Sequence, residues 1–191
     1  MNMVGAIDRQ REVEKYIIRY GQHDTYRMGG TRMEDAKIDV SAFKAGCTYL
    51  DLGCGHGEML EYARNRGLKV TGLEVVPELC VGAVVYGYAH NMPFDNDKFD
   101  YSTAFDVLEH LLPGDDEQAL QELKRVTKSR IVVTTNNHPS SNPKNGDNLH
   151  INIKTYSDWD KLVRKVFVGH EVIWLKGQRR YVSETWQIDL R

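Results

Sequence analysis

Hydrophobic and polar positions in the first 46 residues follow a helical period. Between residues 8 and 20 the apolar positions recur on one side of such a period: Val13, Ile17 and Ile18. This spacing predicts a helix over residues 8–20. Thr31, followed three residues later by Glu34, has the form of a capping box and predicts a second helix that runs to Phe43. The N-terminal part of the chain is therefore predicted to be helical.

From residue 47 onward, short apolar runs alternate with amphipathic segments. The apolar runs predict strands over residues 48–52, 69–75, 84–89, 99–106 and 131–135. The amphipathic segments predict helices, of which the clearest cover 115–128 and 157–167, the latter with Ser157 at its N-cap. This alternation predicts a doubly wound α/β fold, with a parallel sheet and helices on both faces. Two last strand-like runs, 171–176 and 180–188, are joined too tightly for a crossover helix and should pair antiparallel.

Composition favours one globular domain. The chain has 191 residues, 41% of them hydrophobic and 27% charged, which suits a single core and excludes a disordered or disulfide-rich protein. Cys47, Cys54 and Cys80 have no CxxC spacing and are expected to be reduced thiols. The chain shows no signal-peptide pattern and no apolar run near the roughly 18 residues of a membrane span. We therefore expect a cytoplasmic protein that does not associate with a membrane.

Charge adds little to this picture. The formal net charge of −2 provides no strong positive field, so a nucleic-acid partner is not expected. Residues 1–120 carry a net charge of −8 and residues 121–191 a net charge of +6. Such asymmetry is typical of solvated surface, and a basic binding face in the second part is the alternative.

The sharpest chemical signal is the segment YLDLGCGHGE, a predicted strand that runs into a Gly-rich turn at a helix start. Gly53, Gly55 and Gly57 permit unusual backbone angles and let a ligand approach the main chain. A dinucleotide-binding turn has a third glycine where Glu58 stands here. A carboxylate at that helix start would repel a diphosphate. We therefore expect a ligand without phosphates.

Glu74 is the second signal, at the end of the next predicted strand and 21 residues after Gly53. In doubly wound folds an acid in this register accepts hydrogen bonds from both ribose hydroxyls. A solvated surface acid is the alternative, but the register with the Gly-rich turn favours an adenosine ligand.

In order along the chain, LDLGCGHGEML (50–60), VTGLEV (70–75) and GYAHNMPFDNDKFDYSTAFDVLEHL (87–111) resemble the motifs of class I S-adenosylmethionine-dependent methyltransferases. The resemblance is to the small-molecule group of the ubiquinone- and menaquinone-biosynthesis type, and it covers residues 47–135. It implies a Rossmann-like, doubly wound, mostly parallel seven-stranded sheet with a reversed last strand, in a single domain. A helical cap (1–46), a cofactor-binding half (47–135) and an acceptor-side half (136–191) would form that domain.

The resemblance implies S-adenosyl-L-methionine as cofactor. The contacts that it implies are Asp51, Gly53, Cys54, Gly55, Glu74, Tyr88, Ala89, His90, Ala104 and Phe105. The first four would lie along the methionine moiety, Glu74 would bind the ribose, residues 88–90 would meet the adenine, and the last two would border the cofactor from the fourth strand. Tyr88 stands where the family usually has an acid that reaches the adenine amino group. Its hydroxyl would accept that hydrogen bond, or its ring would simply pack.

A possible metal cluster follows the fourth predicted strand. Asp106, Glu109 and His110 lie within one helical turn, and with His150 they are similar to the acid-x-x-Glu-His cluster of metal-dependent small-RNA 2′-O-methyltransferases. However, Leu-Glu-His at this place also occurs widely in metal-free small-molecule enzymes. Bringing His150 across would also require ordering of the loop 136–149 at a cost in conformational entropy. We expect no metal and assign His110 to the acceptor side, as a base or substrate contact.

Two nearby side chains carry expectations of their own. Arg32, with Tyr26 and Arg27, belongs to a segment expected to be a solvated loop, the alternative being an arginine that pairs with the cofactor carboxylate. His56 lies inside the Gly-rich turn and is expected to point outward.

The sequence therefore predicts an enzyme that moves a methyl group from S-adenosylmethionine to a small-molecule acceptor by in-line displacement. It should act as a monomer or homodimer. Three alternatives stay open: a catalytically silent cofactor-binding partner subunit, a metal-dependent RNA 2′-O-methyltransferase, and a nicotinamide oxidoreductase, which Glu58 opposes.

Overall fold

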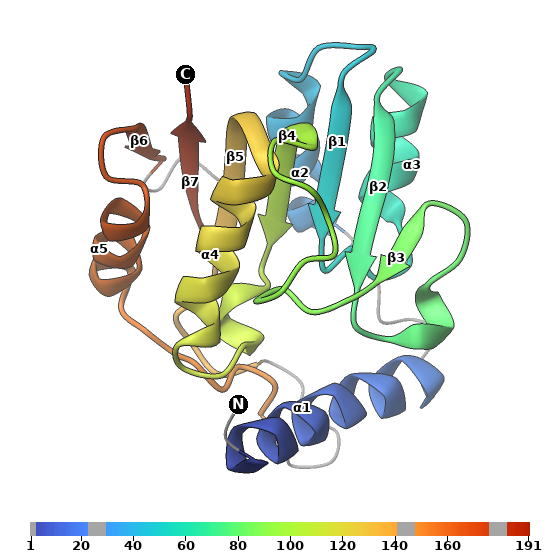
Figure 1. Ribbon diagram of the computed structural model, residues 1–191, viewed down its shortest axis with the longest axis vertical. Helices are drawn as coiled ribbons and strands as arrows, with labels where there is room; N and C mark the ends of the chain where they lie inside the picture. The colour runs from blue at the N-terminus through green and yellow to red at the C-terminus, as the bar shows by residue number, and fades with distance from the viewer. Residues whose placement is uncertain (1–2, 23–29, 141–147, 176–182) are drawn as a thin grey trace.

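The computed structural model describes residues 3–22, 30–140, 148–175 and 183–191 (Figure 1). One seven-stranded sheet, in the order β3-β2-β1-β4-β5-β7-β6, forms its centre. Its strands are β1 (Thr48–Leu52), β2 (Lys69–Glu74), β3 (Val84–Tyr86), β4 (Phe99–Phe105), β5 (Thr127–Thr135), β6 (Glu171–Trp174) and β7 (Glu184–Asp189). The first five are parallel, and β7 is antiparallel to both β5 and β6. The predicted doubly wound sheet with a reversed last strand is confirmed.

Helices cover both faces of this sheet. The helical elements are α1 (Met3–Gln22), α2 (Gly30–Ser41), α3 (Glu58–Asn65), α4 (Asp115–Val126) and α5 (Tyr156–Val166), with the short 3₁₀ turns η1 (Pro77–Leu79) and η2 (Leu108–His110). In Figure 1, α4 lies in front of the sheet and α2 and α3 lie behind it, while α1 crosses the edge at which the parallel strands end. One apolar cluster joins α4 and α5 to the sheet, and a second joins α2 and α3 to it.

The boundary between α4 and β5 differs from its prediction. The helix was expected to reach residue 128, but it ends at Val126, and Thr127 already has extended backbone with φ −110° and ψ 137°. The Thr127 hydroxyl is buried and lies 2.6 Å from that of Ser102 on β4. A β-branched residue with such a cross-strand partner favours the sheet, so β5 begins four residues before its predicted start.

The start of α5 also differs. Ser157 was expected to be the N-cap, but the cap is Thr155, whose hydroxyl accepts a hydrogen bond from the Asp158 N–H at 3.1 Å. Ser157 lies exposed in the first turn of the helix. The predicted antiparallel pairing of the last two strands is confirmed by the β6–β7 register, and parts of those predicted runs, 176 and 180–182, lie outside the described residues.

The structure also describes the cysteines and the helices that were considered as membrane spans. Cys47, Cys54 and Cys80 are all free thiols. Among the helices that the structure describes, none is long and apolar enough to cross a membrane.

The cap of α5 provides a test of this assignment. Thr155→Ala should lower the free energy of unfolding by about 1 kcal/mol, because it leaves the Asp158 N–H without its side-chain acceptor. Ser157→Ala should change it by less than about 0.5 kcal/mol, since that hydroxyl is on the exposed surface. Urea unfolding of both variants measures the difference. Equal effects of the two substitutions would refute Thr155 as the cap.

Candidate functional site

A cavity opens at the carboxyl ends of β1, β2 and β4, beneath α1. Its empty volume, including the open mouth, is about 1320 Å³. The chain order of the strands reverses between β1 and β4, and open α/β sheets bind ligands at this kind of switch point. The Gly-rich turn, the ends of β2 and β4, η2 and α1 all contribute to its walls.

The Gly-rich turn forms one wall and is approached closely from two sides. Gly53 and Gly55 have φ values of 68° and 53°, in the left-handed region that L side chains rarely adopt. A Cβ at Gly53 would lie 2.7 Å from a methyl carbon of Val107, and a Cβ at Gly55 would lie 2.9 Å from the Tyr20 hydroxyl. The backbone conformation therefore favours glycine at both positions, and a side chain at either position would also displace the side chain of Val107 or of Tyr20.

Glu74, at the end of β2, holds this turn in place. Its Oε2 accepts a hydrogen bond from the Gly55 N–H at 2.9 Å, and its Oε1 accepts from Val75 and Val76 at 2.8 and 3.1 Å. Burial raises the pKa of Glu74, and these three bonds oppose that effect. A carboxylate offers about four lone-pair sites, so Oε2 keeps one for a ligand hydroxyl.

Asp51 is buried near the end of β1 and belongs to a network of side chains. Its Oδ1 accepts a hydrogen bond from the Thr103 hydroxyl at 2.7 Å, and that hydroxyl lies 2.6 Å from the Tyr49 hydroxyl. Burial raises the pKa of Asp51 to about 7, although the bond from Thr103 opposes the shift. This group therefore changes charge near neutral pH.

Most of the other predicted cofactor contacts also line the cavity. The structure brings Cys54, Tyr88, Ala89, His90 and Phe105 to its walls together with Asp51, Gly53, Gly55 and Glu74. Ala104 is different, because it is fully buried in the apolar core and is not among the lining residues that the structure describes. Successive residues of a strand point to opposite faces, so Ala104 and Phe105 do not share one environment.

Two expectations about polar side chains are wrong. His56 does not point outward: it lines the cavity, and its ring packs edge-on against Tyr20 at 5.2 Å, because α1 crosses over the turn. Arg32 is not on a solvated loop: it lies on α2 and forms an ion pair with Asp106, Nε to Oδ2, at 2.7 Å. Tyr26 and Arg27 lie outside the described residues.

Sequence reasoning missed the contribution of α1 to the site. Arg9, Val13, Tyr16 and Tyr20 line the cavity. Their spacings of four, three and four residues form one helical stripe, which is the signal that could have found them. Arg9 binds Asp115 at the start of α4 through two hydrogen bonds, which tie α1 across the edge of the sheet.

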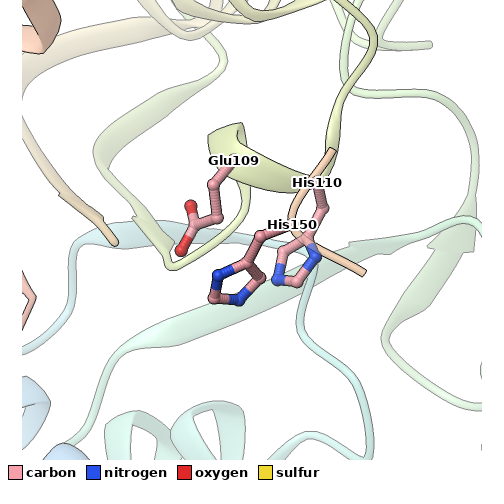
Figure 2. A group of neighbouring side chains, drawn as sticks. All are labelled: Glu109, His110 and His150. Atoms are coloured by element: carbon pink, nitrogen blue, oxygen red, sulfur yellow. The ribbon is translucent and has the colours of Figure 1, made fainter. Parts of the chain in front are cut away.

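η2 places His110 at the cavity wall. Burial and the neighbouring His150 lower the pKa of His110 to about 4, so its imidazole is neutral near pH 7. Figure 2 shows that Glu109 and His150 lie beside it, and the two imidazole rings are 4.7 Å apart. Asp106 does not join this group, since its carboxylate binds Arg32 and the Thr134 hydroxyl.

Comparison with known proteins agrees with this architecture. Residues 50–132 match the sequence profile of the family described as "Methyltransferase domain". The PH0226 protein from Pyrococcus horikoshii OT3 gives a TM-score of 0.70 at 15% identity, with 91% of this chain and 98% of that chain covered. A TehB-like SAM-dependent methyltransferase from Corynebacterium glutamicum gives 0.63 at 19% identity, covering 94% and 98%. Phosphoethanolamine N-methyltransferase 2 from Haemonchus contortus, in complex with S-adenosyl-L-methionine, gives 0.58 at 18% identity, covering 78% and 40%.

No curated protein matches the sequence. At this low identity the solved structures establish the fold alone, and the profile match covers residues 50–132, less than half of the chain. The profile match over residues 50–132 and the fold shared with these structures agree with the motifs that resemble class I S-adenosylmethionine-dependent methyltransferases.

Proposed function

We propose that the chain binds S-adenosylmethionine in the cavity beneath α1 and transfers its methyl group to a small-molecule acceptor that enters beside His110. The observation that carries this proposal is the charge of the cavity. Six carboxylate side chains and two arginines line it. Arg9 and Arg32 are each paired with one of those carboxylates, Asp115 and Asp106. The walls therefore favour a cation.

S-adenosylmethionine fits such walls, because it carries a sulfonium and an ammonium group. A dinucleotide would bring a diphosphate to the start of α3, where Glu58 stands in the first turn. The same negative charge disfavours a phosphodiester chain, which supports a small molecule over a nucleic acid as acceptor.

We assign the cofactor contacts as follows. Asp51 and the turn 53–55 lie along the methionine moiety, Glu74 accepts a hydrogen bond from a ribose hydroxyl, and residues 88–90 with Phe105 border the adenine side. Ala104 supports this wall from the core. When bound, the cofactor supplies a methyl group attached to a positively charged sulfur.

His110 acts on the acceptor in this proposal. Its Nδ1 lies 2.9 Å from the Leu149 carbonyl oxygen, which can only accept a hydrogen bond, so Nδ1 carries the proton. The neutral Nε2 then has a lone pair for an acceptor proton or hydroxyl. Alignment of acceptor and donor methyl group by the cavity walls accounts for most of the catalysis.

Each part of the chain has a role in this proposal. We assign residues 1–46 to a helical cap over the cofactor, 47–135 to the cofactor-binding half and 136–191 to the acceptor side. The three free thiols support a reducing compartment, the cytoplasm, as the place of action. We expect a monomer or a homodimer.

The proposed cofactor site is tested first by ligand binding. S-adenosylhomocysteine, the demethylated product, should raise the melting temperature in proportion to the logarithm of its excess over Kd, and NAD should not. Glu74→Gln should weaken product binding at least tenfold, because its amide NH₂ opposes the backbone N–H donors that now bind the carboxylate. The control Glu61→Gln changes an exposed residue on α3. Equal shifts from NAD and S-adenosylhomocysteine would contradict the proposal.

Asp51 provides a pH test. Its pKa is about 7 in the folded protein against an ordinary value of 3.8, so the folded state keeps a proton that the unfolded chain has lost between these values. Raising the pH from 4 to 8 should therefore lower the free energy of unfolding of the wild type by about 4 kcal/mol relative to that of the Asp51→Asn variant, with little further change above pH 8. Urea unfolding of both proteins at pH 4 to 8 measures it. A constant difference across this range would show that Asp51 has an ordinary pKa.

The proposed reaction is tested by incubating the protein with S-adenosylmethionine and a library of small molecules, with product S-adenosylhomocysteine as the readout. For an accepted substrate, His110→Ala should lower kcat by about a hundredfold, the size of a typical acid–base contribution. Its affinity for S-adenosylhomocysteine should stay within about twofold, since the acceptor side does not hold the adenosine. His170→Ala, at the opposite edge of the sheet, is the control. A loss of cofactor affinity equal to the loss of kcat would contradict the assignment.

A further inference from the structure

We propose that Glu109, His110 and His150 form a binding site for a divalent transition-metal cation at the acceptor-side wall of the cavity. Each of the three offers one ligand atom, and these atoms lie within 4.8 Å of one another. Figure 2 shows the three side chains converging from two segments of the chain, η2 and the stretch before α5. The Asn152 N–H donates to the Glu109 carbonyl at 3.0 Å and holds these segments together.

Both imidazoles are oriented as metal-binding histidines are. His110 Nδ1 lies 2.9 Å from the Leu149 carbonyl oxygen, and His150 Nδ1 lies 2.5 Å from the His138 carbonyl oxygen. Because a carbonyl only accepts, each Nδ1 carries the proton and each Nε2 keeps its lone pair. A backbone carbonyl bound to the far nitrogen is the usual outer partner of a histidine ligand.

Glu109 supplies an independent observation. Its side chain is fully buried, and its Oε1 accepts hydrogen bonds from the backbone and side-chain nitrogens of Asn136 at 3.0 and 3.1 Å. Its Oε2 is buried and has no hydrogen-bond partner among the described residues. An unsatisfied carboxylate oxygen in the interior costs free energy, which a cation at this place would recover.

The donor set indicates the class of cation. Two neutral imidazoles and one carboxylate suit Mn²⁺, Co²⁺ or Zn²⁺ better than Mg²⁺ or Ca²⁺, which prefer oxygen ligands. Three protein ligands also leave coordination positions open, as in catalytic rather than structural sites. Because His110 lines the cavity, a bound cation would border it. Insofar as the proposed function holds, the cation would bind His110 Nε2 in place of the acceptor's own proton or hydroxyl, and an oxygen atom of the acceptor would be the additional ligand of the cation.

The sequence favoured a site without metal, because His150 would have to be brought across a long loop. In the structure, His150 already lies beside His110, with its Nδ1 bound to the His138 carbonyl and its backbone N–H bound to the Asn148 side chain. The folded chain therefore already holds the third ligand in position, so cation binding does not have to order it. Asp106, the remaining acid of the sequence cluster, is occupied by Arg32 and Thr134 and is not a ligand.

Mn²⁺ binding to the full-length protein, after chelator treatment, tests the site without any donor or acceptor. Electron paramagnetic resonance of free Mn²⁺ should show one bound ion per chain, displaced by Zn²⁺ and not by an equal concentration of Mg²⁺. Glu109→Gln and His150→Ala should each weaken Mn²⁺ binding at least tenfold. The control His170→Ala should leave it unchanged, because His170 precedes the start of β6 at the opposite edge of the sheet.

Co²⁺ gives a readout that requires no variant. Binding at this site should produce visible absorption bands of Co²⁺ with nitrogen and oxygen ligands, and Zn²⁺ should abolish them. The absence of stoichiometric Mn²⁺ or Co²⁺ binding by the wild type would overturn the proposal, as would unchanged Mn²⁺ affinity in a folded His150→Ala variant. A protein that binds S-adenosylhomocysteine but no Mn²⁺ refutes the cation site alone. One that binds Mn²⁺ but no S-adenosylhomocysteine refutes the proposed function alone.

Discussion

The cavity depends on the hydrogen bonds between one buried carboxylate and the backbone. Glu74 accepts from Gly55 on the Gly-rich turn and from Val75 and Val76 after β2. These N–H groups need acceptors once water is excluded, and the carboxylate needs donors to offset its own burial. Because donors and carboxylate need each other, these hydrogen bonds hold the ends of β1 and β2 and the start of α3 together as one wall. Ligand recognition at this wall therefore starts from groups that already stabilise the fold.

Two arginines from the N-terminal helices close the other side. Arg9 on α1 binds Asp115, and Arg32 on α2 binds Asp106. Each acid is buried, so the pairing satisfies a charge that would be costly alone, and it also attaches a helix to the open edge of the sheet. Asp51 and Glu74 then face the cavity without an arginine of their own in the described structure, which gives the cavity its negative character.

Asp106 links one wall of the cavity to the proposed cation site. It has φ 53°, an unusual conformation for a residue with a side chain, and the Thr134 hydroxyl and Arg32 hold its carboxylate. This turn ends β4 and directs the chain into η2, which carries Glu109 and His110. The same short segment thus sets one wall of the cavity and the position of Glu109 and His110, so substitutions at Asp106 would disturb both.

The sequence by itself determined the parallel sheet, the Gly-rich turn, Glu74 at the end of β2 and His110 at the cavity, because each follows from local periodicity or from a motif within one strand and turn. Only the tertiary structure decided that Tyr20 covers His56, that Arg32 pairs with Asp106, and that His150 completes a cluster with Glu109. It also decided that Phe105 lines the cavity while Ala104 joins the core. The physical reason is that these contacts join residues distant in sequence, and depend on how α1 and the segment before α5 pack on the edge of the sheet. No local pattern specifies that packing.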